Sequence, residues 1–574
     1  MEISERHKRL IEDASAAFGT RGSLMSLWQE IAYHFYPEMA DFTTNRYLGD
    51  EFADHLTTSY PLMARRTLGD SLSAMLRPIQ LDTTSPGVWF NLRALDERKE
   101  NTQTRRWLEH KTQVQRRAMY DKSANFVRAT KEGDHTFVTF GQAPLYLDLN
   151  KTRDTLLYQC FHLRDVAWRE DAEGKISQIY RKWKPSPLQL YGSFGDKISP
   201  KAKERLSQAP HTNSTAAFDR QGGGVNCLHV MIKAEDYELR DREGKKWRTP
   251  WVSVWIDTDN NWVMEEIGSW QRKYIIPRWV TIPGSQYASS PAVTAALPDA
   301  RLIQAMTLTL LESSEKFADP PMIATEEVIR SDMQLFAGGT TWVDSAYDER
   351  LGAALRPAYE ARANEGVRTG NELRMDVREQ IAKAFFLDSL ALPPASAKEM
   401  TAFEVSQRIS EWIRRAMPIF EPMEFEYNGE ICEQTFELLL RNGAFGSIDD
   451  MPQELRGADV HFKFESPLHE GADMRKGQKF LEAKAALVQA AELDPGVVPL
   501  LNATDTLRDV YKSIGVPAHW TRSRQEMQRL VAAQNAQREE QQVLEAGVGA
   551  ADIAAKLGAA SRDFAQGRAT NPAA

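Results

Sequence analysis

The chain has 574 residues, of which 42% are hydrophobic and 26% are charged, and its formal net charge is −9. This length allows several hydrophobic cores, since one core seldom grows beyond about 250–300 residues. The composition excludes a disordered chain, and no apolar stretch reaches the roughly 18 residues of a membrane span. The acidic balance argues against a tight DNA binder, because neutralised phosphates drive such binding, but it leaves open a protein past which DNA slides.

The N-terminus and the cysteines set further limits. Residues 1–8 contain no apolar stretch, so we expect no secretory signal. Cys160, Cys227 and Cys432 lie far apart and form no zinc or redox spacing. We therefore expect reduced thiols in a reducing compartment.

Residues 1–133 are expected to be helical. Apolar residues recur at helical spacing over 24–35, 62–76 and 107–120, and prolines end the first two runs. The third run is rich in Arg, Lys and Gln, so we expect this helix to be half exposed.

Residues 134–283 are expected to be β-rich, because β-branched and aromatic residues gather there between turn residues. The expected strands are residues 135–140, 143–149, 156–161, 166–169, 176–183, 251–256 and 262–267. Residues 192–224 are polar and rich in Gly, Ser and Lys, so we expect a loop there.

Helical spacing returns after Pro283. A helix is expected over 299–318, with Leu302, Ile303, Met306, Leu310 and Phe317 on one face. It ends where Asp319 precedes two prolines, because proline disfavours helix in the residue before it. A mixed segment follows, with short strands expected near 340–344 and 355–359, and residues 364–386 are helical again.

Residues 386–396 are expected to form a loop. The next helix begins at Thr401 with a capping box and runs to Leu440, where Asn442 and Gly443 end it. Pro418 and Pro422 should bend or split this helix. Two further helical stretches are expected at 472–493 and 521–546, and the small, polar tail after Gly547 is typical of disorder.

No contiguous catalytic motif stands out. The nearest approach to a phosphate-binding loop, at 471–479, has one residue too many between its glycines and Gln478 where the lysine belongs. We interpret it as a helix start, and the glycines at 222–224 as a surface connection. His229 shares a strand face with Cys227, but two further metal ligands are missing. The sequence therefore predicts no enzyme, no metal and no cofactor.

Four short sequence stretches follow one another in a characteristic order along residues 20–445. They are Trp28-Gln29-Glu30-Ile31-Ala32 with Tyr36-Pro37; Leu76-Arg77-Pro78 with Ser85-Pro86-Gly87-Val88-Trp89-Phe90; Ile276-Pro277-Arg278-Trp279 with Tyr287, Ser290-Pro291, Leu297-Pro298-Asp299 and Asp319-Pro320-Pro321; and Met400-Thr401-Ala402-Phe403-Glu404-Val405 with Arg408, Glu411, Pro418 and Glu430. Each stretch alone is modestly specific, but their order and spacing are specific together. In them the chain resembles the portal, or head-to-tail connecting, proteins of short-tailed DNA bacteriophages (podoviruses).

This resemblance implies an α+β, mainly helical portal fold that assembles as a ring, usually of twelve subunits, around a central channel at one capsid vertex. Double-stranded DNA would pass through the channel. The terminase large subunit would dock on one end during packaging, and tail adaptor or head-completion proteins would replace it. Major capsid and scaffolding proteins are further expected partners, and no membrane is. The protein would lie in the virion, and in the host cytoplasm before assembly.

The resemblance also implies a division of the chain into parts. The expected parts are a wing at 1–290, stem helices at 291–318 and 364–386, a clip at 319–363, a tunnel loop at 387–399, a long wing or crown helix at 400–445, and a C-terminal crown at 446–574.

The second stem helix carries basic residues that are candidates for transient contacts with DNA phosphates. These are Arg368, Arg374, Arg378 and Lys383. Arg374 and Arg378 are four residues apart and share a helix face. The alternative is that this face forms ion pairs with Glu372, Asp376 or Glu379 of neighbouring subunits.

Two further sets of candidates lie beside the stem. A valve that grips DNA, or a contact with a neighbouring loop, would use tunnel-loop residues Leu387, Asp388, Leu390, Leu392 and Lys398. The surface that faces terminase or an adaptor would use clip residues Glu326, Glu327, Arg330 and Asp332. Two other functions stay open: a motor or nuclease subunit of DNA packaging, and a capsid or tail adaptor without a channel of its own.

Overall fold

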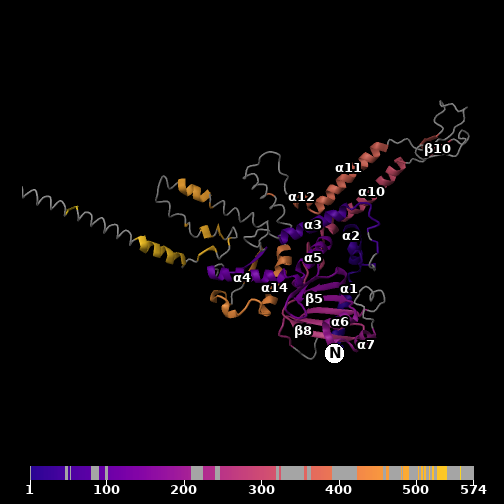
Figure 1. Cartoon of the computed structure of the whole chain (residues 1–574). Coiled ribbons are helices and arrows are strands. Elements are labelled where there is room, and N and C mark those ends of the chain that lie inside the picture. The colour runs from indigo at the N-terminus through magenta and orange to yellow at the C-terminus, as the bar shows by residue number, and fades with distance from the viewer. Residues whose placement is uncertain are drawn as a thin grey trace, which may run out of the picture. The chain divides into compact units, whose positions relative to one another are not determined.

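A computed structural model describes most of the chain (Figure 1). Its long described stretches are residues 2–44, 53–78, 89–96, 101–208, 224–239, 246–318, 363–390 and 423–456. Shorter ones are residues 50–51, 322–324, 355–357, 411, 460–464, 480, 482–489, 502, 506–508, 510–511, 516, 520–522, 526–538 and 556–557. Two compact units are present. Unit 1 comprises Met1–Phe90, Gln113–Gly446 and Phe464–Gln478, and unit 2 comprises Asn91–Thr112, Ser447–Lys463 and Lys479–Ala574.

The N-terminal part of unit 1 is helical, as predicted. Its helices are α1 (Glu5–Gly19), α2 (Gly22–Phe35), η1 (Pro37–Met39), α3 (Tyr60–Leu76), η3 (Lys122–Ala124) and α5 (Phe126–Phe140). Proline ends α2 and opens α3, because proline lacks the amide hydrogen that a helix interior needs but is tolerated in the first turn.

The strand expected at 135–140 is wrong, because these residues form the second half of α5. The β-branched side chains there are accommodated in the helix. The hydroxyls of Thr136 and Thr139 donate to the carbonyl oxygens of Glu132 and His135, at 2.8 and 2.7 Å. Residues 136–140 are all buried, so tertiary packing overrides their strand propensity. The helix ends at Gly141, whose φ is +81°.

A five-stranded antiparallel sheet has the strand order β4-β5-β6-β7-β8. Its strands are β4 (Val166–Glu170), β5 (Ile176–Trp183), β6 (Cys227–Lys233), β7 (Trp251–Asp257) and β8 (Trp262–Ser269). A three-stranded sheet, of order β3-β2-β9, contains β2 (Leu145–Leu149), β3 (Leu156–Cys160) and β9 (Tyr274–Ile275). These strands confirm the predicted hairpins, apart from the residues that belong to α5.

The five-stranded sheet has different cover on its two faces (Figure 1). Leu10, Ala14 and Ala17 of α1 pack on one face, against residues such as Val230 and Val254. Short helices pack on the other face: α6 (Pro187–Phe194), η5 (Gly195–Lys197) and α7 (Pro200–Gln208).

The loop expected at 192–224 is therefore wrong up to Gln208, while 209–223 lie outside the described residues. Ser186 forms a capping box with Gln189, and Pro187 occupies the first turn of α6. Leu190 is fully buried and anchors α6, which is too short for helical periodicity to reveal it from sequence.

The remaining elements of unit 1 follow β9. They are η6 (Ala292–Ala296), α10 (Leu297–Ala318), β10 (Met322–Ala324), β11 (Leu355–Pro357), α11 (Ala363–Ala384), α12 (Leu387–Leu390), η8 (Glu424–Gly429) and α14 (Glu430–Arg441). The helices predicted at 299–318 and 364–386 are confirmed. The helix predicted at 401–441 is confirmed over α14, and most of its first half lies outside the described residues.

Unit 2 contains the first part of α4 (Thr102–Met119) and a two-stranded sheet that pairs β1 (Phe90–Ala94) with β12 (Val460–Phe464). Residues 482–489 and 526–538 are helical, inside the stretches predicted for helices. The strand expected near 340–344 lies outside the described residues.

Candidate functional site: the stem helices

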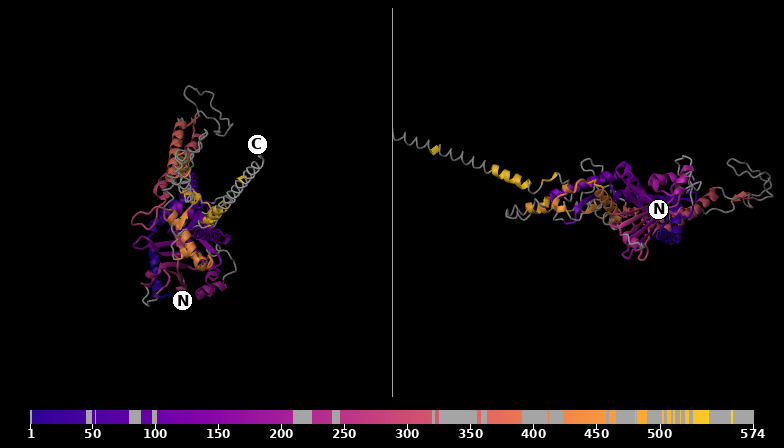
Figure 2. Two further views of the ribbon diagram at one scale, coloured as in Figure 1. Left: turned by 90° about the vertical axis from the view of Figure 1, so that its left-hand side faces the viewer. Right: turned by 90° about the horizontal axis from the view of Figure 1, so that it is seen from below.

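Helices α10 and α11, together called the stem here, pack against each other and lie side by side in Figure 1; Figure 2 shows the chain from two further sides. Each has 22 residues and thus spans about 33 Å. At their outer end, β10 pairs with β11 in an antiparallel ladder. The chain therefore leaves the rest of unit 1 along α10 and returns along α11.

A glycine sets how closely the two stem helices approach. A Cβ atom added at Gly370 of α11 would lie 2.6 Å from Cδ2 of Leu310 in α10, which is inside van der Waals contact. The missing side chain at Gly370 thus leaves room for Leu310. Glycine costs about 1 kcal/mol in a helix interior, so its presence here is explained by packing rather than by helix propensity.

The base of α10 is held by a polar side chain. The Oε1 atom of Gln304 accepts hydrogen bonds from the backbone N–H groups of Thr57 and Thr58, at 2.8 and 3.0 Å. Its amide nitrogen donates to the carbonyl oxygen of Thr58, at 2.9 Å. Gln304 is only 9% exposed, so these bonds satisfy a buried group and fix α10 to the segment before α3.

The base of α11 is held by aromatic packing. Val377, Ile381 and Phe385 lie on one face of the helix end and are buried. The ring of Phe385 meets that of Phe35 edge-on, with centroids 5.4 Å apart. Phe386 follows with a φ of +57° and stacks on Trp279. The stem thus starts from a fixed base in α2 and α3.

The structure divides the four basic candidates of α11 into two pairs. Arg368 and Lys383 are exposed and form ion pairs within their own helix, with Glu372 at 3.3 Å and Glu379 at 2.6 Å. The hydrogen bond to Glu379 and its charge raise the pKa of Lys383. Such exposed pairs contribute little to stability.

Arg374 and Arg378 are instead half-buried on neighbouring turns. The Arg378 guanidinium lies over the ring of Tyr60, 5.3 Å from its centroid. The Nε atoms of both arginines are buried and have no hydrogen-bond partner among the described residues. These two charges therefore lack the carboxylate partners within the described chain that Arg368 and Lys383 have.

The stem also exposes large apolar side chains. Leu302, Leu308 and Leu311 of α10 are 48%, 48% and 51% exposed, and Leu373 and Met375 of α11 are 52% and 66% exposed. Leu302 belongs to the apolar face expected from the sequence, yet it is exposed while Ile303 of the same set is fully buried. The inward positions are Ala300, Ile303, Gln304 and Thr307. The missed signal is that both helices carry apolar residues on two faces.

The expected tunnel loop begins with a helical turn. Leu387, Asp388 and Leu390 belong to α12, directly after α11, which corrects the loop expected there. Leu392 and Lys398 lie outside the described residues, as do the clip candidates Glu326, Glu327, Arg330 and Asp332.

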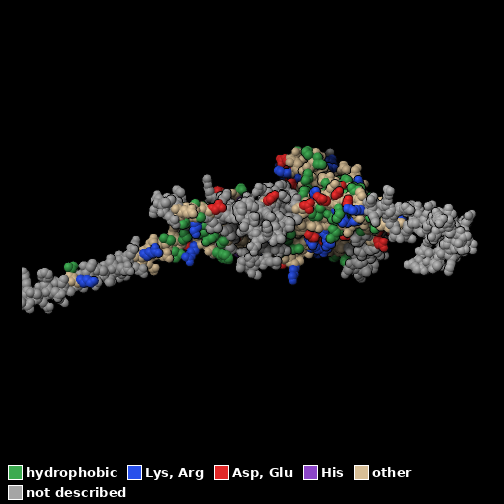
Figure 3. Space-filling model, turned by 90° about the horizontal axis from the view of Figure 1, so that it is seen from above, with side chains coloured by type: hydrophobic (Ala, Val, Ile, Leu, Met, Phe, Trp, Pro, Cys, Tyr) green, Lys and Arg blue, Asp and Glu red, His purple; other side chains and the backbone are tan. Residues whose placement is uncertain are grey.

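Charges on the visible surface are mixed in sign. In the space-filling view of Figure 3, Lys and Arg side chains are interspersed with Asp and Glu on the described part of this face. This pattern agrees with the net charge of −9 and is not that of a basic stripe made for tight DNA binding.

The described residues contain no group of three or more His, Cys, Asp or Glu side chains that could hold a metal ion. Burial raises the pKa of the Cys227 and Cys432 thiols, which keeps both protonated and poorly nucleophilic. None of the described helices combines the length and the apolar character needed to cross a membrane.

Comparison with known proteins gives one family and several similar chains. Residues 7–521 match the family model described as bacteriophage head to tail connecting protein. The chain is 25% identical over 466 residues to the probable portal protein of Bordetella phage BPP-1, covering 78% of this chain and 76% of that protein. It is 21% identical over 466 residues to the portal protein of Salmonella phage epsilon15, covering 80% and 78%. Among solved structures, a chain from the virion of a native gene transfer agent particle matches with a TM-score of 0.33 and 9% identity, over 75% of this chain and 86% of that one.

Proposed function

The chain belongs to the family of bacteriophage head to tail connecting proteins, and we propose that it acts as a phage portal protein, the ring-shaped DNA channel at one capsid vertex. The single observation that carries this proposal is the family match over residues 7–521. The family's description is that of a connector between head and tail, so we assign the chain a structural role in the virion rather than catalysis.

The exposed apolar side chains of the stem support assembly into a ring. Leu308, Leu311, Leu373 and Met375 project from both helices, and such groups on one exposed element are typical of a surface that a partner covers. A neighbouring copy of the same helices is the partner that fits. Head-to-tail contacts of this kind close into a ring when the rotation between copies allows it, and twelve copies are our expectation.

Arg374 and Arg378 are our first candidates for contact with DNA in the channel, with Arg368 and Lys383 as weaker ones. The latter two are already engaged by Glu372 and Glu379 of the same helix. A few cations on an otherwise acidic protein suit a conduit, because many phosphate contacts would hold the DNA too tightly for it to slide.

The other candidates are assigned to the two ends of the stem. We assign Leu387, Asp388, Leu390, Leu392 and Lys398 to a valve at the inner end of the channel, and Glu326, Glu327, Arg330 and Asp332 to the surface that meets terminase or a tail adaptor. Major capsid and scaffolding proteins would be further partners. The protein would occupy the virion vertex after a stage in the host cytoplasm.

Negative-stain electron microscopy of the purified full chain tests the proposal. We expect rings with a central hole about as wide as a DNA duplex. Monomers or filaments without a hole would contradict it. The same preparation, assayed for ATPase and nuclease activity, separates a portal from a motor or nuclease subunit, for which we expect no turnover.

A further inference from the structure

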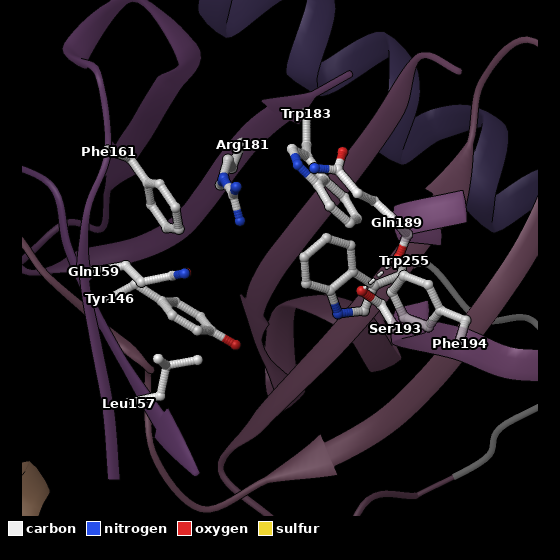
Figure 4. A pocket seen from close by; sticks show the side chains of 10 residues that line it. All are labelled: Tyr146, Leu157, Gln159, Phe161, Arg181, Trp183, Gln189, Ser193, Phe194 and Trp255. Atoms are coloured by element: carbon white, nitrogen blue, oxygen red, sulfur yellow. Dashed lines mark hydrogen bonds between the residues drawn. The ribbon is translucent and has the colours of Figure 1, made fainter. Parts of the chain in front are cut away.

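A pocket of about 460 Å³ opens within unit 1, between the three-stranded and the five-stranded sheet (Figure 4). Leu157 and Gln159 of β3 line one wall, and Trp183 of β5 and Trp255 of β7 line the other. Phe194, at the end of α6, closes one side. Sheets that pack face to face normally fill the space between them with interdigitating side chains, so an open volume here needs an explanation.

The strand register explains why these side chains meet. Arg181 of β5 is paired with His229 of β6, and His229 is paired with Trp255 of β7. Side chains in such a row project from the same face of the sheet. His229 is fully buried and stacks on Trp255, with ring centroids 3.9 Å apart and planes 7° apart. This stacking holds the Trp255 ring, which lines the pocket, in place.

Aromatic rings face each other across the open volume. Tyr146 and Phe161 lie on one side, and Trp183, Trp255 and Phe194 lie on the other (Figure 4). Trp183 and Trp255 meet edge-on at 5.7 Å, and Phe194 packs on Trp255 at 5.3 Å. All but Tyr146 are only half-buried against the described residues. Half-buried aromatic rings around a hollow are typical of a site that receives an apolar or aromatic group.

One cationic side chain, that of Arg181, lines the pocket. The guanidinium of Arg181 lies over the ring of Phe161, 3.4 Å from its centroid, and 5.6 Å from that of Trp183. Among the described residues, no carboxylate lies within 4.0 Å of it to form an ion pair, whereas Arg6, Arg77 and Arg272 of unit 1 each have one. The Arg181 guanidinium also lies near the buried Tyr274 hydroxyl. A planar guanidinium stacked on a ring carries five N–H donors, so further ones remain that can receive a carboxylate in two parallel hydrogen bonds.

The aromatic rings and the single guanidinium together indicate which kind of ligand fits the pocket. A single cation balances a single carboxylate, whereas a nucleic-acid strand usually requires a groove with several cations. The exposed amide of Gln159 on the rim can bond to a peptide backbone. We propose that this pocket binds a short peptide segment of another phage-head protein, in which an aromatic side chain stands next to a carboxylate. The aromatic ring would enter between Tyr146 and Trp255, and the carboxylate would meet Arg181.

The probe for this proposal is the blocked dipeptide acetyl-tryptophanyl-glutamate amide, titrated calorimetrically into the full chain. We expect a dissociation constant of about 1 mM or tighter, as is reasonable for one anchored side chain and one charged contact. The glutamine analogue, which is isosteric but neutral, should bind about tenfold more weakly, because it lacks the charge-assisted hydrogen bonds.

Two variants locate the binding. Arg181→Gln should remove the difference between the acidic and neutral peptides. Lys182→Gln is the matched control, because it removes the same charge from the next residue of β5, which points to the opposite face and contacts Phe18. It should bind both peptides as the unchanged protein does. If Arg181→Gln does not fold, the comparison of the two peptides on the unchanged protein still decides.

Three results would overturn the proposal: no heat of binding with the acidic peptide, equal binding of the two peptides, or an undiminished preference in Arg181→Gln. Tighter binding of thymidine monophosphate than of the acidic peptide would also overturn it, in favour of a nucleotide site. The pocket is separate from the stem, so the outcome is independent of whether the stem lines a DNA channel, which ring formation and packaging report.

Discussion

Arg77 and Asp134 form an ion pair that the fold encloses completely. Arg77 stands just after α3 and Asp134 in the middle of α5, and their side chains are 4% and 0% exposed. Arg77 also donates to Oδ1 of Asn428 in η8, at 2.8 Å, and its guanidinium lies over the ring of Tyr427. Three segments far apart in sequence thus converge on one buried charge.

Removing the acid of this pair should destabilise unit 1 strongly. Asp134→Ala leaves the Arg77 guanidinium buried without its counter-charge, and we expect the free energy of unfolding to fall by about 3–5 kcal/mol. The matched control on the same helix is Glu132→Ala, which breaks only the exposed pair with Arg128 and should cost less than about 1 kcal/mol. Urea unfolding followed by circular dichroism measures both. Equal losses would show that Asp134 does not carry the stability assigned to it.

Gly370 should be required for the two stem helices to pack. Gly370→Leu places a large side chain where Leu310 lies, and overpacking of this kind costs about 1–3 kcal/mol. Adding Leu310→Ala makes room and should restore much of the loss, which a double-mutant cycle on thermal unfolding measures. Gly192→Leu, in α6, is the control, because open space surrounds that position. A cycle with no coupling between positions 310 and 370 would refute the close approach.

Stability should fall in mild acid because of His229. Burial, and the charges of Lys273 and Arg181, hold its pKa well below the ordinary 6.5. Its ring lies 2.6 Å from the Tyr274 hydroxyl and 2.9 Å from that of Ser253. Above pH 6.5 the ring is neutral in both folded and unfolded chains, so it adds no pH dependence. Below pH 6.5 the unfolded chain binds a proton that the folded chain does not, and the free energy of unfolding drops by up to about 1.4 kcal/mol per pH unit.

The variant His229→Gln checks this prediction. It should be less stable than the unchanged protein near neutral pH, because it loses the stacking on Trp255. Its stability should, however, depend less steeply on pH between about 5 and 6.5. Urea unfolding midpoints at several pH values give the pH dependence of stability for the variant and for the unchanged protein. Equal pH dependence in the two proteins would exclude His229 as the cause of the acid sensitivity.

Reversing both half-buried stem arginines should impair genome packaging. Arg374→Glu with Arg378→Glu would place negative charge beside the DNA phosphates and lower the amount of DNA packaged per head. The control pair Arg128→Glu with Lys131→Glu makes the same charge change on exposed positions of α5. Both proteins must first be shown to form rings. If intact rings of the stem variant package a normal amount of DNA, these arginines do not contact DNA in the channel.

Deletion of residues 388–396 should separate assembly from DNA retention. The stem is anchored by Gln304 and Phe385, which lie outside this segment, so we expect rings to form. Heads filled through such rings should then lose DNA during storage. Nuclease protection of packaged DNA measures the loss, and full protection would rule out the valve.

The sequence predicted most elements wherever a strong period or a proline marked them. Helices α2, α3, α10 and α11 and the hairpin of β7 and β8 were predicted from sequence within a few residues. Prediction from the sequence failed where the secondary-structure propensity of a segment disagreed with its burial in the fold. Residues 135–140 look like a strand because they are β-branched and aromatic, but all-round burial makes them the end of α5. Residues 192–208 look like a loop because they are polar and rich in Gly, Ser and Lys, but they form the end of α6, η5 and α7.

The candidate site divides in the same way. By itself the sequence determined the family and the stem helices, since motif order, helical spacing and proline positions are local properties of the chain. Only the tertiary structure decided that Arg368 and Lys383 are paired within α11 while Arg374 and Arg378 are not, and that Arg181 faces an aromatic pocket. The burial and partners of a charge depend on residues far away in the chain, such as Tyr60 and Phe161, and no local pattern specifies those contacts.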